Sequence, residues 1–203
     1  MQGTARGPQR FWKIKPELRI LGLDDGSFER DSRTVPLVGV VFRGGIMLEG
    51  VMTRWIERDG RDSTDKIIEM VRSSRHAGQL RVIMSESITF GGFNLMDIQR
   101  VWQETGLPVI AVTREKPNPE KVRKALKKFP DFRERWELVK RAGKVHPVEV
   151  RGGRLYLQLS GVRVEDAREI LRLTETHGLL PEPVRVAHLI ATGISRGNSA
   201  MVR

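Results

Sequence analysis

The chain contains no cysteine, which excludes disulfide bridges and thiolate metal ligands and agrees with a reducing, cytoplasmic location. It also lacks any apolar run near the ~20 residues that cross a bilayer, so we expect no transmembrane segment and no membrane partner. Residues 1–19 are basic but have no apolar stretch of the kind found in secretory signals. With 39% hydrophobic and 30% charged residues, the composition indicates a globular protein.

Acidic residues are also in short supply. The chain has 25 Asp and Glu against 36 Lys and Arg, a formal net charge of +11. Such a field favours a polyanionic partner, and we expect DNA, with RNA not excluded. A thermophilic surface rich in both signs of charge is the alternative. Residues 114–144 hold 12 Lys or Arg against 5 acids, and this segment would either follow phosphates or form a solvated face.

The hydrophobic pattern predicts an α/β fold. Strands are expected at residues 18–24, 35–42, 46–56, 80–84 and 108–113, and a hairpin at 145–150 and 155–159. Helices are expected at residues 62–75, 95–105, 119–128, 131–142, 164–177 and 183–194, with Asn94 as the N-cap of the second.

This order of elements also predicts how the strands pair. The first three should form an antiparallel meander, and the fourth and fifth, which lie between helices, should run parallel to the first. The result resembles the ribonuclease H-like arrangement: a mixed five-stranded sheet with flanking helices, followed by a C-terminal hairpin and two helices.

The stretch RILGLDDGSF, residues 19–28, carries a strand into two adjacent carboxylates. Neighbouring side chains of a strand point to opposite faces, so Asp24 and Asp25 cannot enter one site together. Asp24 shares its face with Gly22, which leaves room beside it. For Asp24, a functional carboxylate and a strand-end acid in water both stay open. Asp25 is expected to begin a turn with Gly26.

Two further acids are predicted near Asp24. Glu86 follows the fourth strand, a neighbour of the first, and Asp62 precedes the first helix, where a helix cap is the alternative. Close carboxylates repel one another unless a cation lies between them. Oxygen ligands suit Mg²⁺ or Mn²⁺, either of which supports phosphodiester hydrolysis. We therefore predict a metal site made by Asp24, Asp62 and Glu86.

Several motifs carry a family resemblance: LGLDDGSF, GRDSTDKIIEM, SITFGGFN and GLLPEPVRVAHLIATG. In this order and spacing they resemble endonuclease V and, more closely, its archaeal relative endonuclease dU. The resemblance implies metal-dependent cleavage of DNA near a deaminated base, as in DNA repair: hypoxanthine for endonuclease V, deoxyuridine for endonuclease dU. It covers residues 17–203 as a single endonuclease V-like domain, after a basic arm at residues 1–16.

By position, Asp24 matches the family's first-strand catalytic Asp, Asp62 the acid before the first long helix, and Glu86 the acid after the fourth strand. Three features depart from endonuclease V. Glu86 lies in Ser-Glu-Ser rather than Asp-Gly, and Val162 stands where a His is expected before the penultimate helix. The strand-separating wedge has no clear counterpart in residues 53–62.

The segment TFGGFN is a candidate contact for nucleic acid. Gly91 and Gly92 allow a backbone or base to approach closely, Asn94 would start a helix, and Phe90 or Phe93 offers a surface on which a flipped base stacks. The alternative is that the phenylalanines belong to the core and the glycines make a turn.

Arg185, His188 and Arg196 complete the predicted nucleic-acid contacts. Arg185 and His188 are three residues apart on one side of a helix. His188 is also a candidate substitute for the missing His, with helix packing as the alternative. Arg196 would hold a phosphate or belong to a frayed end.

The leading hypothesis is a divalent-metal endonuclease. The first alternative is a nucleic-acid-binding protein on the same fold that has lost catalysis, motivated by Val162 and by the changed setting of Glu86. The second is a small-molecule phosphohydrolase.

Overall fold

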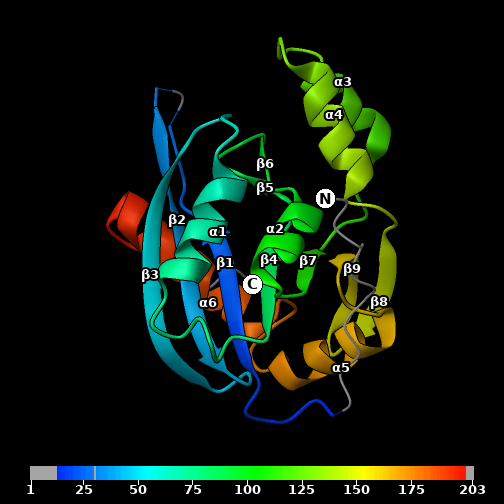
Figure 1. Cartoon of the computed structure of the whole chain (residues 1–203). Helices are drawn as coiled ribbons and strands as arrows, with labels where there is room; N and C mark the ends of the chain where they lie inside the picture. The colour runs from blue at the N-terminus through cyan, green and yellow to red at the C-terminus, as the bar shows by residue number, and fades with distance from the viewer. Residues whose placement is uncertain (1–12, 30, 200–203) are drawn as a thin grey trace, which may run out of the picture.

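The computed structural model describes residues 13–29 and 31–199, so most of the predicted basic arm lies outside the described residues. Its centre is a seven-stranded mixed sheet (Figure 1). In spatial order its strands are β3 (Met47–Glu57), β2 (Thr34–Arg43), β1 (Arg19–Asp25), β4 (Val82–Glu86), β7 (Val109–Thr113), β9 (Gly153–Ser160) and β8 (His146–Val150).

The strand directions agree with the sequence-based expectation. β1, β2 and β3 form an antiparallel meander, and β4 and β7 continue the sheet in parallel with β1. The expected number of five strands was wrong, because the C-terminal hairpin joins the sheet through β9, which pairs antiparallel with β7. This pairing covers the edge that β7 would otherwise expose, and it buries Leu155 and Leu157.

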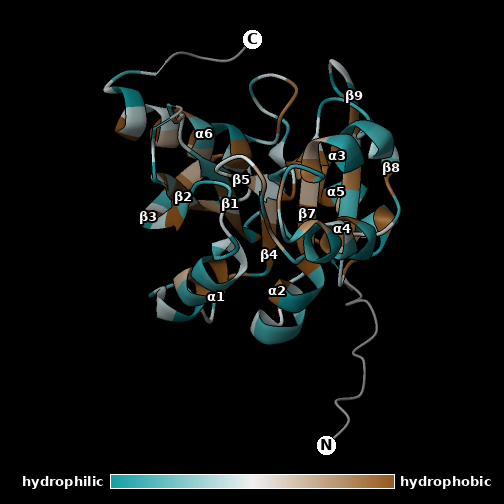
Figure 2. Ribbon diagram, turned by 90° about the horizontal axis from the view of Figure 1, so that it is seen from above, coloured by the Kyte–Doolittle hydropathy of each residue, from teal (hydrophilic) through white to brown (hydrophobic). Residues whose placement is uncertain are grey.

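Helices cover both faces of the sheet. They are α1 (Ser63–Ser73), α2 (Ile98–Thr105), α3 (Pro119–Leu126), α4 (Phe132–Arg141), α5 (Val164–Thr174) and α6 (Glu182–Arg196). Figure 2 shows α6 on one side of the sheet and α1 and α2 on the other. Leu21 and Leu23 of β1 enter the core beneath α1 and α2, whereas Ile20 enters the core beneath α5 and the start of α6. No described helix has the length and apolar character needed to cross a membrane.

The segment between β4 and α2 differs from its prediction. A short ribbon, β5 (Thr89–Phe90) and β6 (Asn94–Leu95), stands where we expected a helix to begin at Asn94. Asp97 caps α2 instead, since its side chain accepts two backbone N–H groups of the first turn. The ribbon delays the helix because Asn94 is buried and its side chain binds other segments.

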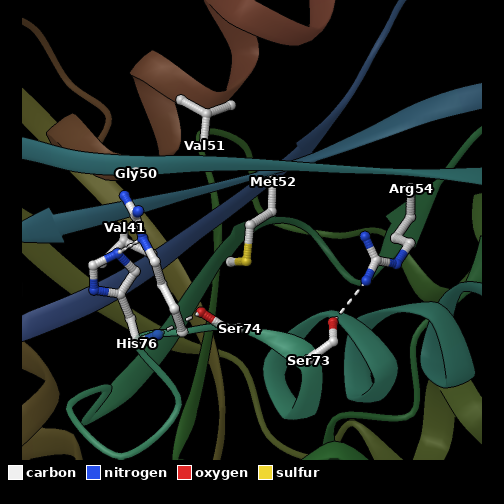
Figure 3. Close-up of a pocket in the computed structure, with 9 residues that line it drawn as sticks. Val41, Gly50, Val51, Met52, Arg54, Ser73, Ser74 and His76 are labelled. Atoms are coloured by element: carbon white, nitrogen blue, oxygen red, sulfur yellow. Dashed lines mark hydrogen bonds between the residues drawn. The ribbon is translucent and has the colours of Figure 1, made fainter.

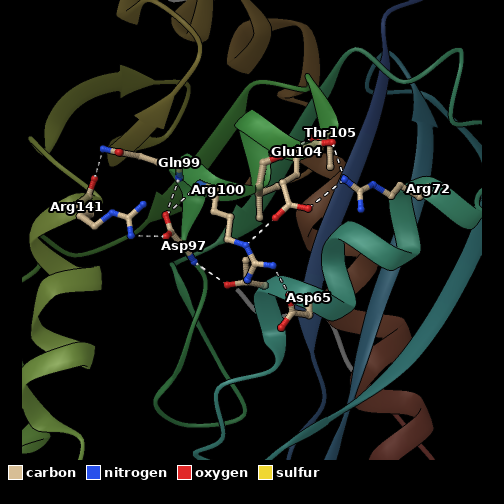
Figure 4. A network of polar contacts seen from close by, with 10 residues as sticks. Asp65, Arg72, Asp97, Gln99, Arg100, Glu104, Thr105 and Arg141 are labelled. Carbon is tan, nitrogen blue, oxygen red and sulfur yellow. Dashed lines mark hydrogen bonds and ion pairs between the residues drawn. The ribbon is translucent and has the colours of Figure 1, made fainter. Parts of the chain in front are cut away.

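Asp97 also belongs to a polar network that joins three helices (Figure 4). Its second oxygen pairs with Arg141 of α4 at 2.9 Å. Arg100 of α2 pairs with Asp65 of α1 and with Glu104, both at 2.7 Å. The network holds α4 against α2 and so gives the α3–α4 hairpin a defined position above the end of β7.

Candidate metal centre

Asp24 is positioned by the close contact between β1 and α6. Gly22 shares its face, and a Cβ added there would lie 2.3 Å from the carbonyl oxygen of Pro183. A glycine is therefore required for the first turn of α6 to lie on the strand. Just over one turn later, His188 Nδ1 lies 2.7 Å from Asp24 Oδ2. Gly26 is similarly close to α6, because a Cβ there would lie 2.9 Å from the carbonyl oxygen of Ala191.

Asp24, Glu86 and His188 form a cluster, referred to below as the Asp24 cluster. One ligand atom from each lies within 4.8 Å of the others. The two acids meet because β1 and β4 are parallel neighbours whose C-terminal ends reach the same edge of the sheet. Ligands of one divalent ion lie at most roughly 4–5 Å apart, about twice a metal–oxygen bond. The three side chains therefore have a spacing suitable for one ion.

In the Asp24 cluster, the charged forms of both carboxylates are disfavoured. Burial raises the pKa of Asp24, against the hydrogen bond and charge of His188, which lower it. Burial and the nearby charge of Asp24 raise the pKa of Glu86. The hydrogen bond to Asp24 raises the pKa of His188. Carboxylates whose charged form is disfavoured in this way, in one cluster, are typical of a site that receives a cation.

Asp25 is the last residue of β1, and the expectation that it begins a turn was wrong. Its carboxylate accepts the backbone N–H of Gly91 at 2.9 Å and so ties the strand end to the β5–β6 loop. Burial, followed by the charge of Asp24, raises the pKa of Asp25 to about 7. The charge of Asp24 therefore acts on the carboxylate of Asp25, whereas the hydrogen bond of Asp25 holds the β5–β6 loop.

Asp62 does not lie in the Asp24 cluster. Its carboxylate accepts the side-chain amide of Asn94 at 2.6 Å and the backbone N–H of Glu57 at 3.1 Å. It precedes α1 but makes no side-chain cap bond. Asn94 in turn accepts the N–H of Ser63 at 3.0 Å. The structure thus places Asp62 as the anchor of a buried asparagine, apart from the other two acids.

The same loop has two further anchors. Asp59 accepts the N–H of Phe93 at 2.9 Å, and Arg135, which is 5% exposed, donates to the carbonyl oxygens of both residues. We refer to Asp59, Asp62, Asn94 and Arg135 as the loop-anchoring network. It fixes the β5–β6 loop against the turn that follows β3.

The predicted base contacts in TFGGFN are not presented to a ligand. Phe90 is 1% exposed and Asn94 is 0% exposed, so the side chains of both belong to the interior. Gly91 and Gly92 adopt positive φ angles of 50° and 89° and make the turn. A Cβ at Gly92 would lie 2.5 Å from Asp59 Oδ1. The core-and-turn alternative thus describes Phe90, Gly91 and Gly92.

The C-terminal candidates have different surroundings. Arg185 pairs with Glu182 at 2.6 Å, which neutralises its charge within α6. Arg196 is exposed at the last residue of that helix. His188 lies in the Asp24 cluster rather than in helix packing. Val162, which stands where a His was expected, is buried in the core. The imidazole beside Asp24 comes from His188 instead.

Arg114 is a site residue that the sequence reasoning missed. It follows β7, the third parallel strand, and its Nε lies 3.6 Å from Glu86 Oε1. That Nε is buried and has no hydrogen-bond partner among the described residues. The available signal was its position, since a residue directly after a strand parallel to β1 and β4 reaches the same edge of the sheet.

A cavity of about 350 Å³ lies elsewhere, between β3 and the end of α1 (Figure 3). Arg54 lines it and already donates to Ser73 at 2.7 Å and to Glu69 at 2.9 Å. None of the described residues that line it is acidic, so it does not offer a site for a divalent cation.

The strand order, the helices on both faces and the acidic edge define a ribonuclease H-like α/β protein. The catalytic domain of human endonuclease V has a similar structure, with a TM-score of 0.60 at 13% identity over 94% of this chain and 89% of that one. A Ciona intestinalis endonuclease V, solved with DNA containing an inosine, gives a TM-score of 0.56 at 12% identity over 84% and 82% of the two chains.

The chain belongs to the endonuclease dU family, whose family model matches residues 16–195. A UPF0215 protein of Methanothermobacter thermautotrophicus is 50% identical over 191 residues, 93% of each chain. The crystal structure of an Archaeoglobus fulgidus protein is similar with a TM-score of 0.80 and 41% identity, over 87% of this chain and 98% of that one.

Proposed function

We propose that the protein is a divalent-metal-dependent endonuclease that cuts the DNA backbone near a deaminated base, deoxyuridine or deoxyinosine, in DNA repair. The observation that carries this proposal is the convergence of Asp24, Glu86 and His188 within 4.8 Å. Membership of the endonuclease dU family supports it, as does the net charge of +11. The inosine-containing DNA bound by the Ciona endonuclease V supports the choice of substrate.

Asp24, Glu86 and His188 would hold Mg²⁺ or Mn²⁺. Their oxygen and nitrogen donors fit such an ion, and a cation would relieve the repulsion between the two acids. When bound, the ion supplies a hydroxide at neutral pH and stabilises negative charge on the leaving oxygen. Asp24 orients the imidazole of His188 through Nδ1, as carboxylates beside metal-binding histidines commonly do.

Arg114 would contact the phosphate. Its guanidinium carries a buried Nε without a hydrogen-bond partner among the described residues and lies next to Glu86. A phosphate oxygen beside the Asp24 cluster would supply the missing acceptor. The charge-assisted hydrogen bond would place the scissile bond against the two acids.

The test is cleavage of duplexes that contain one uracil or one hypoxanthine, with Mg²⁺ or Mn²⁺. We expect Asp24→Asn to lose more than about 100-fold in rate, since even residues that support metal ligands are worth ~10–100-fold. Asp65→Asn, an exposed acid on α1, is the matched control and should cut like the wild type. Undiminished cutting by Asp24→Asn would remove the site assignment.

A nucleic-acid-binding protein without catalysis remains the second hypothesis, and the position of His188 argues against it. That hypothesis drew on the absence of a histidine at Val162, whereas an imidazole does lie beside Asp24. Salt-dependent DNA binding with neither Mn²⁺ uptake nor cutting would select it. Turnover of free nucleotides but not of DNA would select a phosphohydrolase.

A further inference from the structure

The two helices of the α3–α4 hairpin differ in surface charge. Residues 119–128, which comprise α3 and the turn after it, hold five Lys or Arg and a single acid, Glu120. α4 mixes the two signs of charge, and its exposed Lys140 pairs with Glu137 at 2.5 Å. The excess of positive charge in residues 114–144 is therefore concentrated on α3.

Three lysines of this segment face away from the protein. Val122 and Leu126 pack against the core, and Lys124 and Lys127 lie on the opposite side of the helix, with Lys121 beside them. All three lysines are exposed, and none has an ion pair with a described residue. Lysines three residues apart are neighbours on a helix and repel one another. This set, referred to below as the α3 basic face, therefore suits a partner with closely spaced negative charges.

The α3 basic face is held in a defined position. Asn118 caps α3, because its side chain accepts two backbone N–H groups of the first turn at 3.0 Å. After α3, Phe129 packs edge-to-face against Phe93 of the β5–β6 loop, with ring centroids 5.7 Å apart. Asp25 ties the same loop to the end of β1. The lysines are thus fixed relative to the strand end that carries the Asp24 cluster.

The α3 basic face is also within reach of DNA at the Asp24 cluster. Arg114, which neighbours Glu86, precedes Pro119 by five residues, and five residues span at most roughly 18 Å. α3 itself has eight residues and adds about 12 Å. One turn of duplex DNA is about 34 Å long. The lysines therefore lie within about one turn of duplex from a phosphate at the Asp24 cluster.

We propose that the α3 basic face binds the phosphate backbone of duplex DNA on one side of the cut, whatever base is present. The proposal rests on the DNA partner of the proposed function and adds a contact surface outside the Asp24 cluster. Lysine is a flexible point charge that neutralises phosphates, and such contacts position a protein on DNA without reading its sequence. The alternative, a solvated face, predicts no contribution to binding.

The salt dependence of binding tests this proposal. A fluorescent duplex with one uracil is titrated with the protein in EDTA, so that the strand is not cut, at several salt concentrations. The triple variant Lys121→Gln, Lys124→Gln, Lys127→Gln should bind more weakly at low salt. Each lost phosphate contact makes the plot of log affinity against log salt less steep by about 0.9, so we expect a change in slope of about 2.7.

A matched control removes three charges elsewhere. Arg75, after α1, and Arg168 and Arg172 of α5 are exposed, and Figure 1 shows α5 at the end of the molecule away from α3. Changing these three arginines to Gln lowers the net charge by the same amount and should leave the slope close to the wild-type value. Both triple variants should bind Mn²⁺ like the wild type in calorimetry, which shows that they fold.

Shortening the duplex gives a second measurement. When one flank of the uracil is cut to a few base pairs, well under one turn, the wild-type slope should become less steep because the DNA no longer reaches α3. The same shortening should have no further effect on the lysine variant. If shortening either flank affects the two proteins equally, α3 makes no backbone contact.

The outcomes separate this proposal from the proposed function. If the wild type cuts and the lysine variant keeps the wild-type slope, or the arginine control changes the slope as much, the α3 basic face is a solvated surface while the nuclease function stands. If the wild type cuts neither damaged duplex with either metal and the lysine variant still lowers the slope, the nuclease function fails while the α3 basic face remains a DNA-binding surface.

Discussion

Two sets of acidic side chains lie near the ends of the sheet strands, and they are stabilised differently. In the loop-anchoring network, Asp59 and Asp62 accept N–H groups from Phe93 and Asn94, so their charge is solvated by the protein itself. In the Asp24 cluster, two carboxylates lie close together; burial raises the pKa of both, and the charge of Asp24 raises the pKa of Glu86 further. Acids that accept hydrogen bonds from the protein stabilise its structure. Buried acids whose charged form is disfavoured indicate a binding site.

The contrast gives Asp25 an intermediate position. It anchors the β5–β6 loop through Gly91, as the loop-anchoring network does, yet its pKa rises to about 7 beside Asp24. The charge of Asp24 therefore affects the protonation of Asp25, which holds the β5–β6 loop. Three measurements test the separation between the two sets of acids, beginning with the one expected to be largest.

The largest effect should come from metal removal. In Mn²⁺ at about 100 times its Kd, the wild type should resist unfolding by ~2.7 kcal/mol more than in EDTA, because the ion binds the folded state. Glu86→Gln should lose this gain, since it removes a charged ligand of the Asp24 cluster. Urea titrations with and without Mn²⁺ measure the difference. An equal gain in Glu86→Gln would show that the ion binds elsewhere.

A smaller effect is expected from the loop-anchoring network. Asp62→Ala leaves the Asn94 amide and the Glu57 N–H without this acceptor and should lower the free energy of unfolding by about 1–3 kcal/mol. Mn²⁺ affinity, measured by calorimetry, should stay at the wild-type value. The control Asp65→Ala removes an exposed acid whose ion pair with Arg100 is also exposed, and it should lower stability by about 1 kcal/mol or less.

Asp62→Ala also decides to which of the two sets of acids Asp62 belongs. A loss of Mn²⁺ affinity as deep as that of Asp24→Asn would place Asp62 at the metal, as its position in the sequence suggested. Unchanged affinity with lowered stability would assign it to the loop alone.

Much of the fold was predictable because its signals are local. Apolar runs joined by short turns predict the meander, and helical periodicity with end signals predicts the six helices. The pairing of β9 with β7 was not predictable in this way, because it is a tertiary contact: the pattern indicates a hairpin but not the sheet edge that the hairpin joins. Asn94 was misassigned for the same reason: its partners Asp62 and Ser63 lie about 30 residues earlier.

For the site, sequence reasoning located the acids better than their neighbours. Asp24 and Glu86 were found because parallel strands end at one edge of a sheet. His188 and Arg114 depend on how α6 crosses β1 and on which way a residue after β7 turns. For His188 the available signal was Gly22, since a glycine beside a functional acid allows a helix to lie against the strand.

The smallest expected effect concerns Asp25 and pH. Its folded-state pKa of about 7 is above the model-peptide value of 3.8, so the folded state binds more protons in between. Stability in EDTA should therefore fall as pH rises from about 4 to 7, with the full penalty above 7. Asp25→Asn removes that penalty and keeps an acceptor for Gly91, so it should be more stable than the wild type at pH 8. The difference should vanish near pH 4. Urea titrations at both pH values measure it, and a variant that is less stable at pH 8 would show that Asp25 serves the loop and carries no strain from the Asp24 cluster.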